Sequence, residues 1–539
     1  MEILQGVGAS AGLAVGKIKF WLPEIYNTAY HKVDDPDEEI DRFNRAKHQA
    51  VAQLTQLYEK TASTLGEEQA LLFNIHQMMM EDEDFVGAVF DAIKNESANA
   101  EYAVQKSTDA QAGVLVVTKD PYMMDRVADV HDICRRLLRI LSGKTETAIA
   151  LDEACIVAAA DLTPSDTAQL DRGKVLAVLT AKGSANSHTA IFARVLGIPA
   201  VVNLGDSIHA GVDGLTVCVD GADGTVCLDP DKETLDDFET RHAALRQDKE
   251  RLQEFFGKQT KTKDGRRIEI HANIGSTDDL ERVIANDAEG IGLFRSEFLF
   301  LGRDIAPTEE EQFRAYKKAA EKMAGKRVTI RTLDIGADKH VDYLNVSKEE
   351  NPALGLRGIR LCLEYPEIFT TQLRAILRAS AFGRIAVMFP MVNSVNDVRR
   401  AKQFLESVKR QLDDSGVAFD RQMEVGVMIE TPAAALISES LAQHVDFFSI
   451  GTNDLTQYTL AADRQNQSLA QYCDPYHEAV VRLIEITVQN AHDHGAWVGV
   501  CGELGADPKM TKWFVENDID ELSVAPSDVL MLRSIIAEM

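Results

Sequence analysis

The second half of the chain repeats one pattern, a short apolar run typical of a buried strand followed by a longer helix-like span. Nine such runs can be marked, at 268–274, 290–298, 328–335, 356–359, 385–391, 425–429, 447–450, 498–501 and 522–524. Residues 260–539 have the length of a (β/α)8 barrel with modest insertions, and we predict that fold. Because such a barrel has eight strands, at least one of the nine runs is not one of them.

Reactive side chains lie near the carboxyl ends of most of these runs. They are Arg295, Arg331, Glu430, Asn453, Asp454, Cys501 and Glu503. Barrel enzymes build their active sites from this end of the strands. The regular placement therefore predicts an active site at the carboxyl-terminal face of the barrel.

A single histidine, His188, follows a loop of small residues in the first half of the chain. Residues 183–187 read Gly-Ser-Ala-Asn-Ser, which lets backbone N–H groups approach an anion closely. The apolar run 191–196 predicts a short helix whose positive end would face that anion. Imidazole is a competent nucleophile near neutral pH, so the pattern suits a phosphohistidine. The alternative from these residues alone is a solvated or capping histidine.

The longest motif covers residues 446–464, where a predicted strand breaks at Gly451. Asn453 and Asp454 follow the break, and Arg464 lies further along. An Asn/Asp pair at a strand end suits a hard cation such as Mg²⁺, and an arginine suits a phosphate. The alternative is a helix N-cap, a position that both Asn and Asp favour.

Together, the His188 loop and the 446–464 motif resemble the two signatures of the phosphoenolpyruvate-utilising enzymes. Within that group the chain is most similar to the enzyme I family of the bacterial sugar phosphotransferase system, over essentially its whole length. The downstream motif matches closely. The upstream one departs at three positions: Ser184 replaces a usual Gly, Asn186 a usual Thr, and Phe192 a usual aliphatic residue. These departures affect the expected loop shape and leave the histidine in place.

The resemblance implies a phosphotransferase that moves the phosphoryl group of phosphoenolpyruvate (PEP) to His188. The group then passes to a histidine of the small phosphocarrier HPr, in the first step of sugar uptake. It also implies substrate binding by Arg295, Arg331, Asn453 and Arg464, Mg²⁺ binding by Glu430 and Asp454, and proton donation to the enol carbon by Cys501. It gives Arg357 a supporting role, and Thr167 a hydrogen bond to the His188 ring.

Each of these residues has an alternative role. One arginine alone can form a structural ion pair with an acid such as Asp334 or Asp463. Glu430 can be a buried acid paired to an arginine, and Cys501 can be a small core residue.

We expect four regions along the chain. They are a phosphohistidine α/β domain at 1–20 and 145–230, a helical HPr-binding domain at 21–144, a charged helical linker at 231–259, and a PEP-binding and dimerisation barrel at 260–539. Strand-like runs in the α/β domain lie at 18–20, 154–158, 175–179 and 215–219. The resemblance implies that this domain swivels and that the barrel half forms a homodimer.

The helical region contains an acidic segment, residues 67–84, with six acids and neither Lys nor Arg. An apolar strip of Leu72, Ile75, Met78 and Met79 accompanies the acids. Such a surface suits docking of a basic protein with an apolar patch, and the resemblance favours HPr. The alternative is a solvated helix face over an ordinary core.

Bulk composition narrows the function classes. The net charge of −28 argues against nucleic-acid binding and favours a basic protein partner. No apolar run is long enough for a membrane span, and the amino terminus lacks the pattern of a signal peptide. Seven scattered cysteines without a C-x-x-C pair favour a reduced cytoplasmic setting.

Two rival functions share the motifs. A PEP synthase or dikinase needs an ATP-grasp domain before the phosphohistidine, and residues 21–144 are too few and lack a Gly-rich nucleotide loop. A regulatory phosphoprotein that only reports the PEP level is the second rival. Its nitrogen-related relatives carry an additional amino-terminal sensory domain, whereas this sequence begins with the α/β unit.

Overall fold

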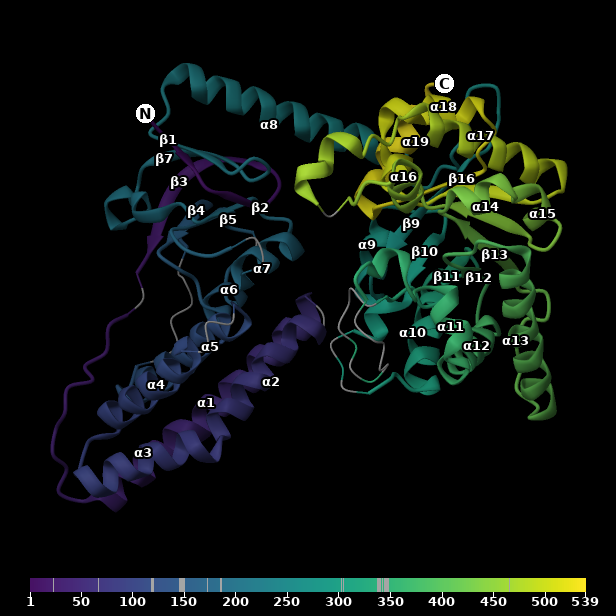
Figure 1. The fold of residues 1–539 in the computed structure, drawn as a ribbon. Coiled ribbons are helices and arrows are strands. Elements are labelled where there is room, and N and C mark those ends of the chain that lie inside the picture. Colours follow the sequence, from purple (N-terminus) through teal and green to yellow (C-terminus); the bar gives the residue numbers. More distant parts are fainter. Residues whose placement is uncertain are drawn as a thin grey trace. The chain divides into compact units, whose positions relative to one another are not determined.

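The computed structural model describes residues 1–22, 24–65, 67–117, 121–144, 151–171, 173–184, 187–301, 303, 305–336, 341, 343, 349–464 and 466–539. The chain divides into two compact units, Met1–Gln247 and Asp248–Met539 (Figure 1). The first unit combines a β-sheet with a helical insert, and the second contains a closed barrel. The predicted fold class is therefore confirmed.

An eight-stranded mixed sheet forms the base of the first unit. Its strands are β1 (Glu2–Gln5), β2 (Val7–Ser10), β3 (Leu13–Trp21), β4 (Cys155–Ala159), β5 (Val175–Thr180), β6 (Ala200–Val202), β7 (Thr216–Asp220) and β8 (Thr225–Leu228). The order is β1-β8-β7-β3-β4-β5-β6-β2. β3 and β4 are parallel neighbours although the whole helical insert separates them in sequence. The chain therefore leaves the sheet and returns to it at adjacent strands.

The described residues of the insert form five helices. They are α1 (Pro36–Leu65), α2 (Glu67–Glu81), α3 (Glu83–Glu96), α4 (Ala100–Val117) and α5 (Pro121–Leu141). Phe43, Leu54, Phe73, Val89 and Leu137 are fully buried in their common core. No helix is found in the described residues between β3 and Pro36, so the helical structure begins later than residue 21.

Two short helices pack against each other in the first unit, and the second begins at His188. α6 (Pro164–Ala168) has Thr163 as its N-cap, and α7 (His188–Leu196) has Ser187, whose Oγ accepts a hydrogen bond from the N–H of Ala190 at 3.4 Å. α7 ends at Gly197, which adopts a left-handed conformation with φ of 67°. The predicted helix after the histidine is present, and it begins at His188 itself.

The linker forms one long helix, α8 (Lys232–Gln253). Most of its side chains are exposed, as the charged sequence predicts, and Phe238 is buried. The boundary between the two compact units falls inside this helix.

The second unit is built on eight parallel strands that close into a barrel. They are β9 (Glu269–Ile274), β10 (Ile291–Arg295), β11 (Val328–Arg331), β12 (Ile385–Phe389), β13 (Glu424–Ile429), β14 (Phe447–Ile450), β15 (Trp497–Val500) and β16 (Glu521–Val524). β16 pairs with β9, which completes the closure. All eight overlap predicted runs.

The ninth predicted run, 356–359, is not a strand. A short turn, η6 (Pro352–Leu354), precedes it, and α11 (Ile359–Glu364) begins at its last residue. Gly358 has φ of 58°, which breaks any extended conformation there. An apolar run this short looks the same whether it begins a helix or forms a strand.

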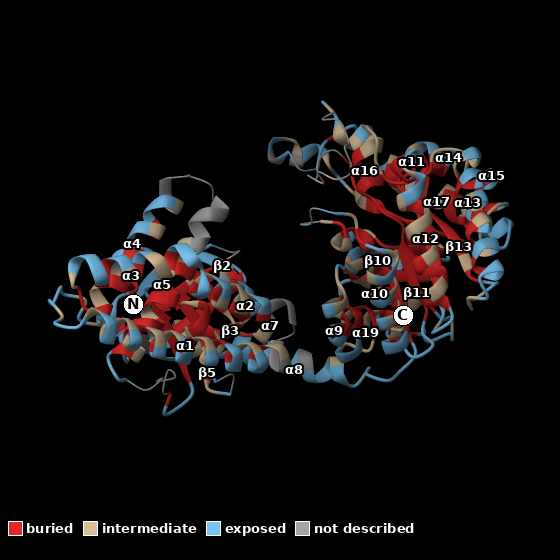
Figure 2. Ribbon diagram, turned by 90° about the horizontal axis from the view of Figure 1, so that it is seen from below, coloured by how far each residue is buried: buried red, intermediate tan, exposed pale blue. Residues whose placement is uncertain are grey.

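Helices surround the barrel and bury its outer surface. They are α9 (Leu280–Ala285), α10 (Glu309–Lys322), α11, α12 (Pro366–Ser380), α13 (Val395–Asp414), α14 (Pro432–Leu436), α15 (Ser438–Ala442), α16 (Thr452–Leu460), α17 (Glu478–Asp493), α18 (Pro508–Glu516) and α19 (Val529–Ala537). Most residues of the barrel strands are buried (Figure 2), and they belong to two hydrophobic clusters. A smaller inner cluster, which includes Leu293, Met388, Phe447 and Cys501, fills the barrel itself.

Among the helices in the described part of the chain, none is long and apolar enough to cross a membrane. All seven cysteines are free thiols, and all except Cys473 are buried.

Candidate active site

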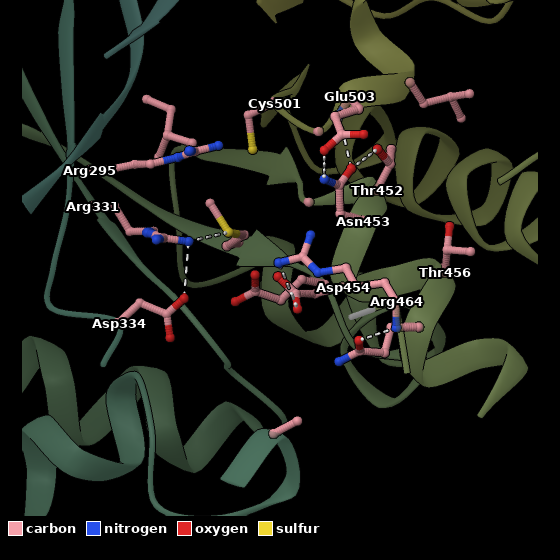
Figure 3. Close-up of a pocket in the computed structure, with 18 of the residues that line it drawn as sticks. Arg295, Arg331, Asp334, Thr452, Asn453, Asp454, Thr456, Arg464, Cys501 and Glu503 are labelled. Atoms are coloured by element: carbon pink, nitrogen blue, oxygen red, sulfur yellow. Dashed lines mark hydrogen bonds and ion pairs between the residues drawn. The ribbon is translucent and has the colours of Figure 1, made fainter. Parts of the chain in front are cut away.

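A cavity of about 1100 Å³ opens at the carboxyl ends of the barrel strands (Figure 3). Every predicted site residue of the barrel half lines it: Arg295, Arg331, Glu430, Asn453, Asp454, Arg464 and Cys501. Arg357 and Glu503 line it as well. The structure thus brings together residues that lie up to about two hundred positions apart in the sequence, as the barrel fold predicts.

Arg295 and Arg331 are the last residues of β10 and β11, and they pair across these parallel strands. Arg295 is exposed, and no carboxylate among the described residues forms a salt bridge with it. Arg331 is buried, and its Nη2 donates to Glu297 Oε1 at 2.9 Å, while its Nη1 lies 3.1 Å from Asp334 Oδ2. Arg331 is therefore held rigidly, whereas the guanidinium of Arg295 remains available to a ligand.

The Asp334 carboxylate holds a second arginine. Arg357 Nε donates to Asp334 Oδ1 at 3.2 Å and its Nη2 to Oδ2 at 2.9 Å. Burial lowers the pKa of Arg357, but the Asp334 carboxylate raises it more, so the net pKa lies above its usual value. The same balance holds for Arg331 between burial and its carboxylate neighbours Glu297 and Asp334. Both arginines stay charged in the cavity wall.

Glu430 follows β13 and is fully buried. Its Oε1 accepts a hydrogen bond from the N–H of Met391 at 2.5 Å, and its Oε2 has no hydrogen-bond partner among the described residues. Burial raises the pKa of Glu430 to about 8, and the nearby carboxylates of Asp334 and Asp454 contribute to the increase. Gly451 leaves room for this carboxylate, because a Cβ there would lie 3.2 Å from Glu430 Oε2. The free oxygen is suited to a cation.

Asn453 and Asp454 lie in the first turn of α16, one strand along from Glu430. The N-cap of this helix is Gly451, so neither side chain serves as the cap. Asp454 Oδ1 is buried and forms no hydrogen bond within the described part of the chain; it lies 3.7 Å from Arg357 Nη1 and 3.9 Å from Arg464 Nη2. A second carboxylate oxygen is thus available to a ligand beside Glu430.

Cys501 follows β15, and its side chain is buried in the inner cluster while still lining the cavity. Its Sγ lies 3.6 Å from the carbonyl oxygen of Ile450. Burial raises the pKa of the Cys501 thiol to about 11. The sulfur is consequently protonated at neutral pH, which is the form that a proton donor requires.

His188 lies in the other unit, at the amino terminus of α7. The His188 side chain lies outside the described part of the structure. So do residues 185–186, which include Asn186, one of the three departures from the family signature. Thr167 is buried, and its hydroxyl donates within its own helix, to the carbonyls of Thr163 at 3.1 Å and Pro164 at 2.9 Å. The predicted hydrogen bond from Thr167 to the His188 ring stays a prediction.

Comparison with known proteins assigns the chain to a family. Residues 249–539 match the PEP-binding domain of PEP-utilising enzymes, residues 5–126 their N-terminal domain, and residues 151–224 their mobile domain. The phosphoenolpyruvate-protein phosphotransferase of Bacillus subtilis (strain 168) is 41% identical over 541 residues, covering 100% of this chain and 95% of that protein. The chain belongs to the phosphoenolpyruvate-protein phosphotransferase family.

A second member of this family, from Listeria monocytogenes, is 41% identical over 534 residues, with 99% of this chain and 93% of that protein aligned. A solved structure described as Enzyme I (nEIt) is 34% identical, with a TM-score of 0.38, and covers 45% of this chain and 99% of that one. Family membership confirms the predicted resemblance and identifies the chain as an enzyme.

Sequence analysis missed Glu297 and named Asp334 only as an alternative ion-pair partner for an arginine, which is the contact that the structure shows. Glu297 and Asp334 bind the arginine side chains, and Glu297 Oε1 also accepts from the N–H of Asp334 at 3.0 Å. Both follow their strand-end arginines by two or three positions, at 295–297 and 331–334. An acid just beyond a strand-end arginine is the signal that could have identified them.

The predicted docking segment forms α2 and the start of α3. Of the predicted apolar strip, Met78 is 72% exposed, whereas Leu72, Ile75 and Met79 are half-buried. Phe73, His76 and Met80 are buried, and Leu71, outside the predicted strip, is 50% exposed. The side chains of Glu67 and Glu68 lie outside the described residues. The helix therefore has both a core face and an apolar exposed face, so neither the docking interpretation nor the solvated-face alternative accounts for all of it.

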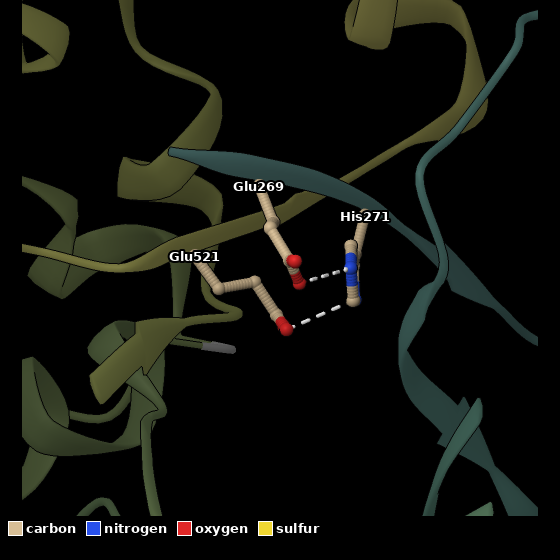
Figure 4. A group of neighbouring side chains, drawn as sticks. All are labelled: Glu269, His271 and Glu521. Carbon is tan, nitrogen blue, oxygen red and sulfur yellow. Dashed lines mark ion pairs between the residues drawn. The ribbon is translucent and has the colours of Figure 1, made fainter. Parts of the chain in front are cut away.

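One cluster of potential metal ligands lies at the opposite, amino-terminal end of the barrel (Figure 4). His271 contacts Glu269 Oε2 through Nε2 at 3.1 Å and Glu521 Oε2 through Nδ1 at 2.9 Å. Arg327 Nη2 already lies between the two carboxylates, at 3.0 Å from Glu269 and 2.6 Å from Glu521. Because cationic groups occupy the carboxylates, we interpret this cluster as a buried ion-pair network. It is separate from the predicted Mg²⁺ ligands.

Proposed function

We propose that this enzyme transfers the phosphoryl group of PEP to His188 and then to a histidine of HPr. The observation that carries the proposal is the cavity at the barrel mouth, where arginines and two carboxylates with free oxygens converge. PEP bears a phosphate and a carboxylate, and such a ligand needs several cations around it. The match to a PEP-binding domain over these same residues supports this substrate.

In the proposed complex, Arg295, Arg331 and Arg464 bind the phosphate, and the amide of Asn453 contacts the substrate. Phosphoryl transfer passes through a loose transition state, so positioning and charge stabilisation dominate the catalysis. Rigid arginines such as Arg331 supply both without reorganising during the reaction. We assign Arg357 a supporting role at the same wall.

The donor set fits Mg²⁺, since Glu430 Oε2 and Asp454 Oδ1 are buried oxygens without hydrogen bonds. We propose these two carboxylates as its protein ligands, because Mg²⁺ commonly takes one or two carboxylates and completes its shell with water and substrate. When bound, the ion neutralises charge that develops on the phosphoryl oxygens.

In the transfer itself, the bond between phosphorus and the enol oxygen of PEP breaks, and a bond from phosphorus to a ring nitrogen of His188 forms. The electron pair left on the enolate then takes a proton at the methylene carbon, which gives pyruvate. We propose that Cys501 donates this proton, since its thiol is protonated and lines the cavity.

The phosphoryl group on His188 would then pass to HPr, docked on the helical insert. The exposed apolar residues of α2 beside acidic segments support a basic partner with an apolar patch. We also propose that the barrel half forms the homodimer that the family resemblance implies. Free cysteines throughout the chain support a reducing compartment such as the cytoplasm.

The deciding experiment incubates the purified protein with PEP labelled in its phosphate, Mg²⁺ and HPr, with and without ATP. We expect label on this protein without ATP, and its transfer to HPr on addition of the phosphocarrier. Labelling that requires ATP would favour the dikinase function, and label that never leaves for HPr would favour the regulatory one.

A further inference from the structure

Tyr458 belongs to the long motif at 446–464 but has no role in the reaction proposed above. Tyr458 lies in α16, four positions after Asp454, so the two side chains emerge from the same face of the helix. Its ring is partly buried, and it is absent from the residues that line the cavity directly. Any role in the reaction must therefore pass through its neighbours.

The Tyr458 hydroxyl has two partners, and its chemistry fixes the direction of both hydrogen bonds. Arg357 Nη1 donates to Tyr458 Oη at 3.1 Å, because a guanidinium carries only donors. The single hydroxyl hydrogen then points to the carbonyl of Ala353, with which Oη forms a short hydrogen bond. Burial raises the pKa of Tyr458, so the hydrogen stays in place at neutral pH.

The first partner, Arg357, is held on its other edge by Asp334, through Nε at 3.2 Å and Nη2 at 2.9 Å. Tyr458 binds the remaining corner of the guanidinium, at Nη1. The same Nη1 is 3.7 Å from Asp454 Oδ1. The plane of the guanidinium is thus fixed from both ends, and its position relative to Asp454 depends partly on the hydroxyl.

The second partner, Ala353, belongs to the cavity wall together with Pro352. Two further side chains hold this segment among the described residues. The carboxylate of Glu349 accepts from the N–H of Leu356 at 3.0 and 3.2 Å, and Arg360 Nη1 donates to the carbonyls of Leu354 and Gly355, both at 3.0 Å. The Tyr458 hydroxyl joins the wall to α16, which carries Asn453 and Asp454. One oxygen atom therefore links the backbone of the wall, a cationic side chain and the helix of the long motif.

We propose that Tyr458 is a positioning residue, whose hydroxyl fixes Arg357 and the wall segment 352–357 in the arrangement that binds the anionic substrate. This inference rests on the proposed function, since it takes PEP as the ligand of the cavity. Because a fixed cation binds substrate and transition state alike, the hydroxyl should act on KM more than on kcat.

The test variant is Tyr458→Phe, which removes the hydroxyl and keeps the ring. Hydrogen bonds to charged groups are strong, so we expect kcat/KM for PEP to fall about 10–100-fold, mainly through KM. A matched control is Tyr316→Phe, which also loses a buried hydroxyl, bonded to Gln312 and Gln372 and outside the cavity wall. The control should match any loss in thermal stability while keeping the wild-type KM.

A double-mutant cycle with Arg357→Ala tests whether Tyr458 acts on substrate binding through Arg357. If Tyr458 acts through Arg357, the effect of Tyr458→Phe on KM should shrink several-fold in the Arg357→Ala background. Additive effects, or a wild-type KM in Tyr458→Phe, would overturn the inference. These outcomes are distinguishable from failure of the proposed function, which is tested on the wild-type protein by the labelling experiment with PEP, HPr and ATP.

Discussion

Asn453 and Glu503 hold each other through two hydrogen bonds at the barrel mouth, from Asn453 Nδ2 to Glu503 Oε1 and from the N–H of Glu503 to Asn453 Oδ1, both 2.9 Å long. The amide of Asn453 is consequently oriented, with its oxygen engaged and one N–H left for a ligand. Asn453 therefore faces the cavity as a hydrogen-bond donor.

This geometry makes Asn453→Asp more harmful than Glu503→Gln. The aspartate would remove the free donor and place a negative charge beside Glu503 and the anionic substrate. We expect kcat/KM for PEP to fall about 10–100-fold, as for a lost hydrogen bond to a charged group. Glu503→Gln keeps an acceptor for Asn453 and should lose less than about tenfold. Steady-state kinetics decide, and equal losses in the two variants would contradict the assigned orientation.

Cys501→Ala should bind PEP and Mg²⁺ with near-native affinity but turn over about 10²–10⁴-fold more slowly, as expected for a lost general acid. Exchange of pyruvate methyl hydrogens with solvent deuterium, in the presence of the phosphorylated enzyme, should be lost. Turnover at the wild-type rate would return Cys501 to the core-packing role, with water held by Glu503 as the next candidate donor.

Alkylation of Cys501 should become faster as the pH rises. With the thiol pKa raised to about 11, the thiolate fraction grows about tenfold per pH unit between neutral pH and pH 10. Inactivation by iodoacetamide should accelerate accordingly, and PEP should protect. The control is Cys473→Ala, because Cys473 is the less buried thiol in the same cavity. A rate that levels off near pH 8 would contradict the raised pKa.

The fold was predicted well where the sequence pattern is long and regular. Eight barrel strands overlap predicted runs because each contains recurring apolar residues and is separated from the next by a helix-like span. Strands β1, β2, β6 and β8 of the first unit were missed because they span only three or four residues, which is too short for a periodicity to appear. Pairing with neighbouring strands of the sheet, and not local pattern, determines these short elements.

The site was predicted through its ligand-facing residues and not through those behind them. Arginines and carboxylates at strand ends are visible in sequence, but the pairing of Glu297 with Arg331 depends on how two adjacent strand ends meet. Likewise, nothing local to 446–464 shows that the Tyr458 hydroxyl meets the backbone of Ala353. Such contacts between distant segments follow from the closed barrel only once its register is known.

The ion-pair network of His271 with Glu269 and Glu521, at the amino-terminal end of the barrel, predicts that the stability of the protein depends on pH. Burial lowers the pKa of His271, but Glu521 and Glu269 raise it more, so the net pKa in the folded state is above 6.5. The resulting stabilisation is fully present below about pH 6.5 and is lost as the pH rises through the folded pKa. Calorimetry of the full chain should show the barrel transition moving to lower temperature with rising pH. His271→Gln, which cannot titrate, should flatten that dependence, and an unchanged dependence would contradict the assignment.

His188→Ala should abolish phosphoenzyme formation and leave PEP binding in the barrel largely intact, because His188 and the barrel cavity belong to different units. The native adduct should be acid-labile and base-stable, as a phosphoramidate is. An acid-stable adduct would point to Ser187 or Thr189. The structure makes these poorer nucleophiles, since Ser187 caps α7 and the Thr189 hydroxyl is buried, donating to the carbonyl of Leu162 at 3.3 Å.

Substitutions in α2 should test docking of HPr separately from phosphoryl transfer to His188. Leu71 and Met78 are seven positions apart, on one face of the helix, and both are exposed, so replacing them should not disturb the core. In Leu71→Ser/Met78→Ser we expect labelling by PEP at the wild-type rate, and a KM for HPr raised about tenfold or more, as for loss of apolar contact residues.

Charge reversal tests the acidic part of the same surface. Glu67, Glu68 and Asp84 changed together to Lys should weaken transfer to HPr and flatten its salt dependence. The N-cap Asp82 is left unchanged, because its side chain accepts from the N–H groups of Asp84 and Phe85 at the start of α3. If both sets of changes leave the transfer rate and its salt response as in the wild type, α2 is an ordinary solvated helix and HPr docks elsewhere.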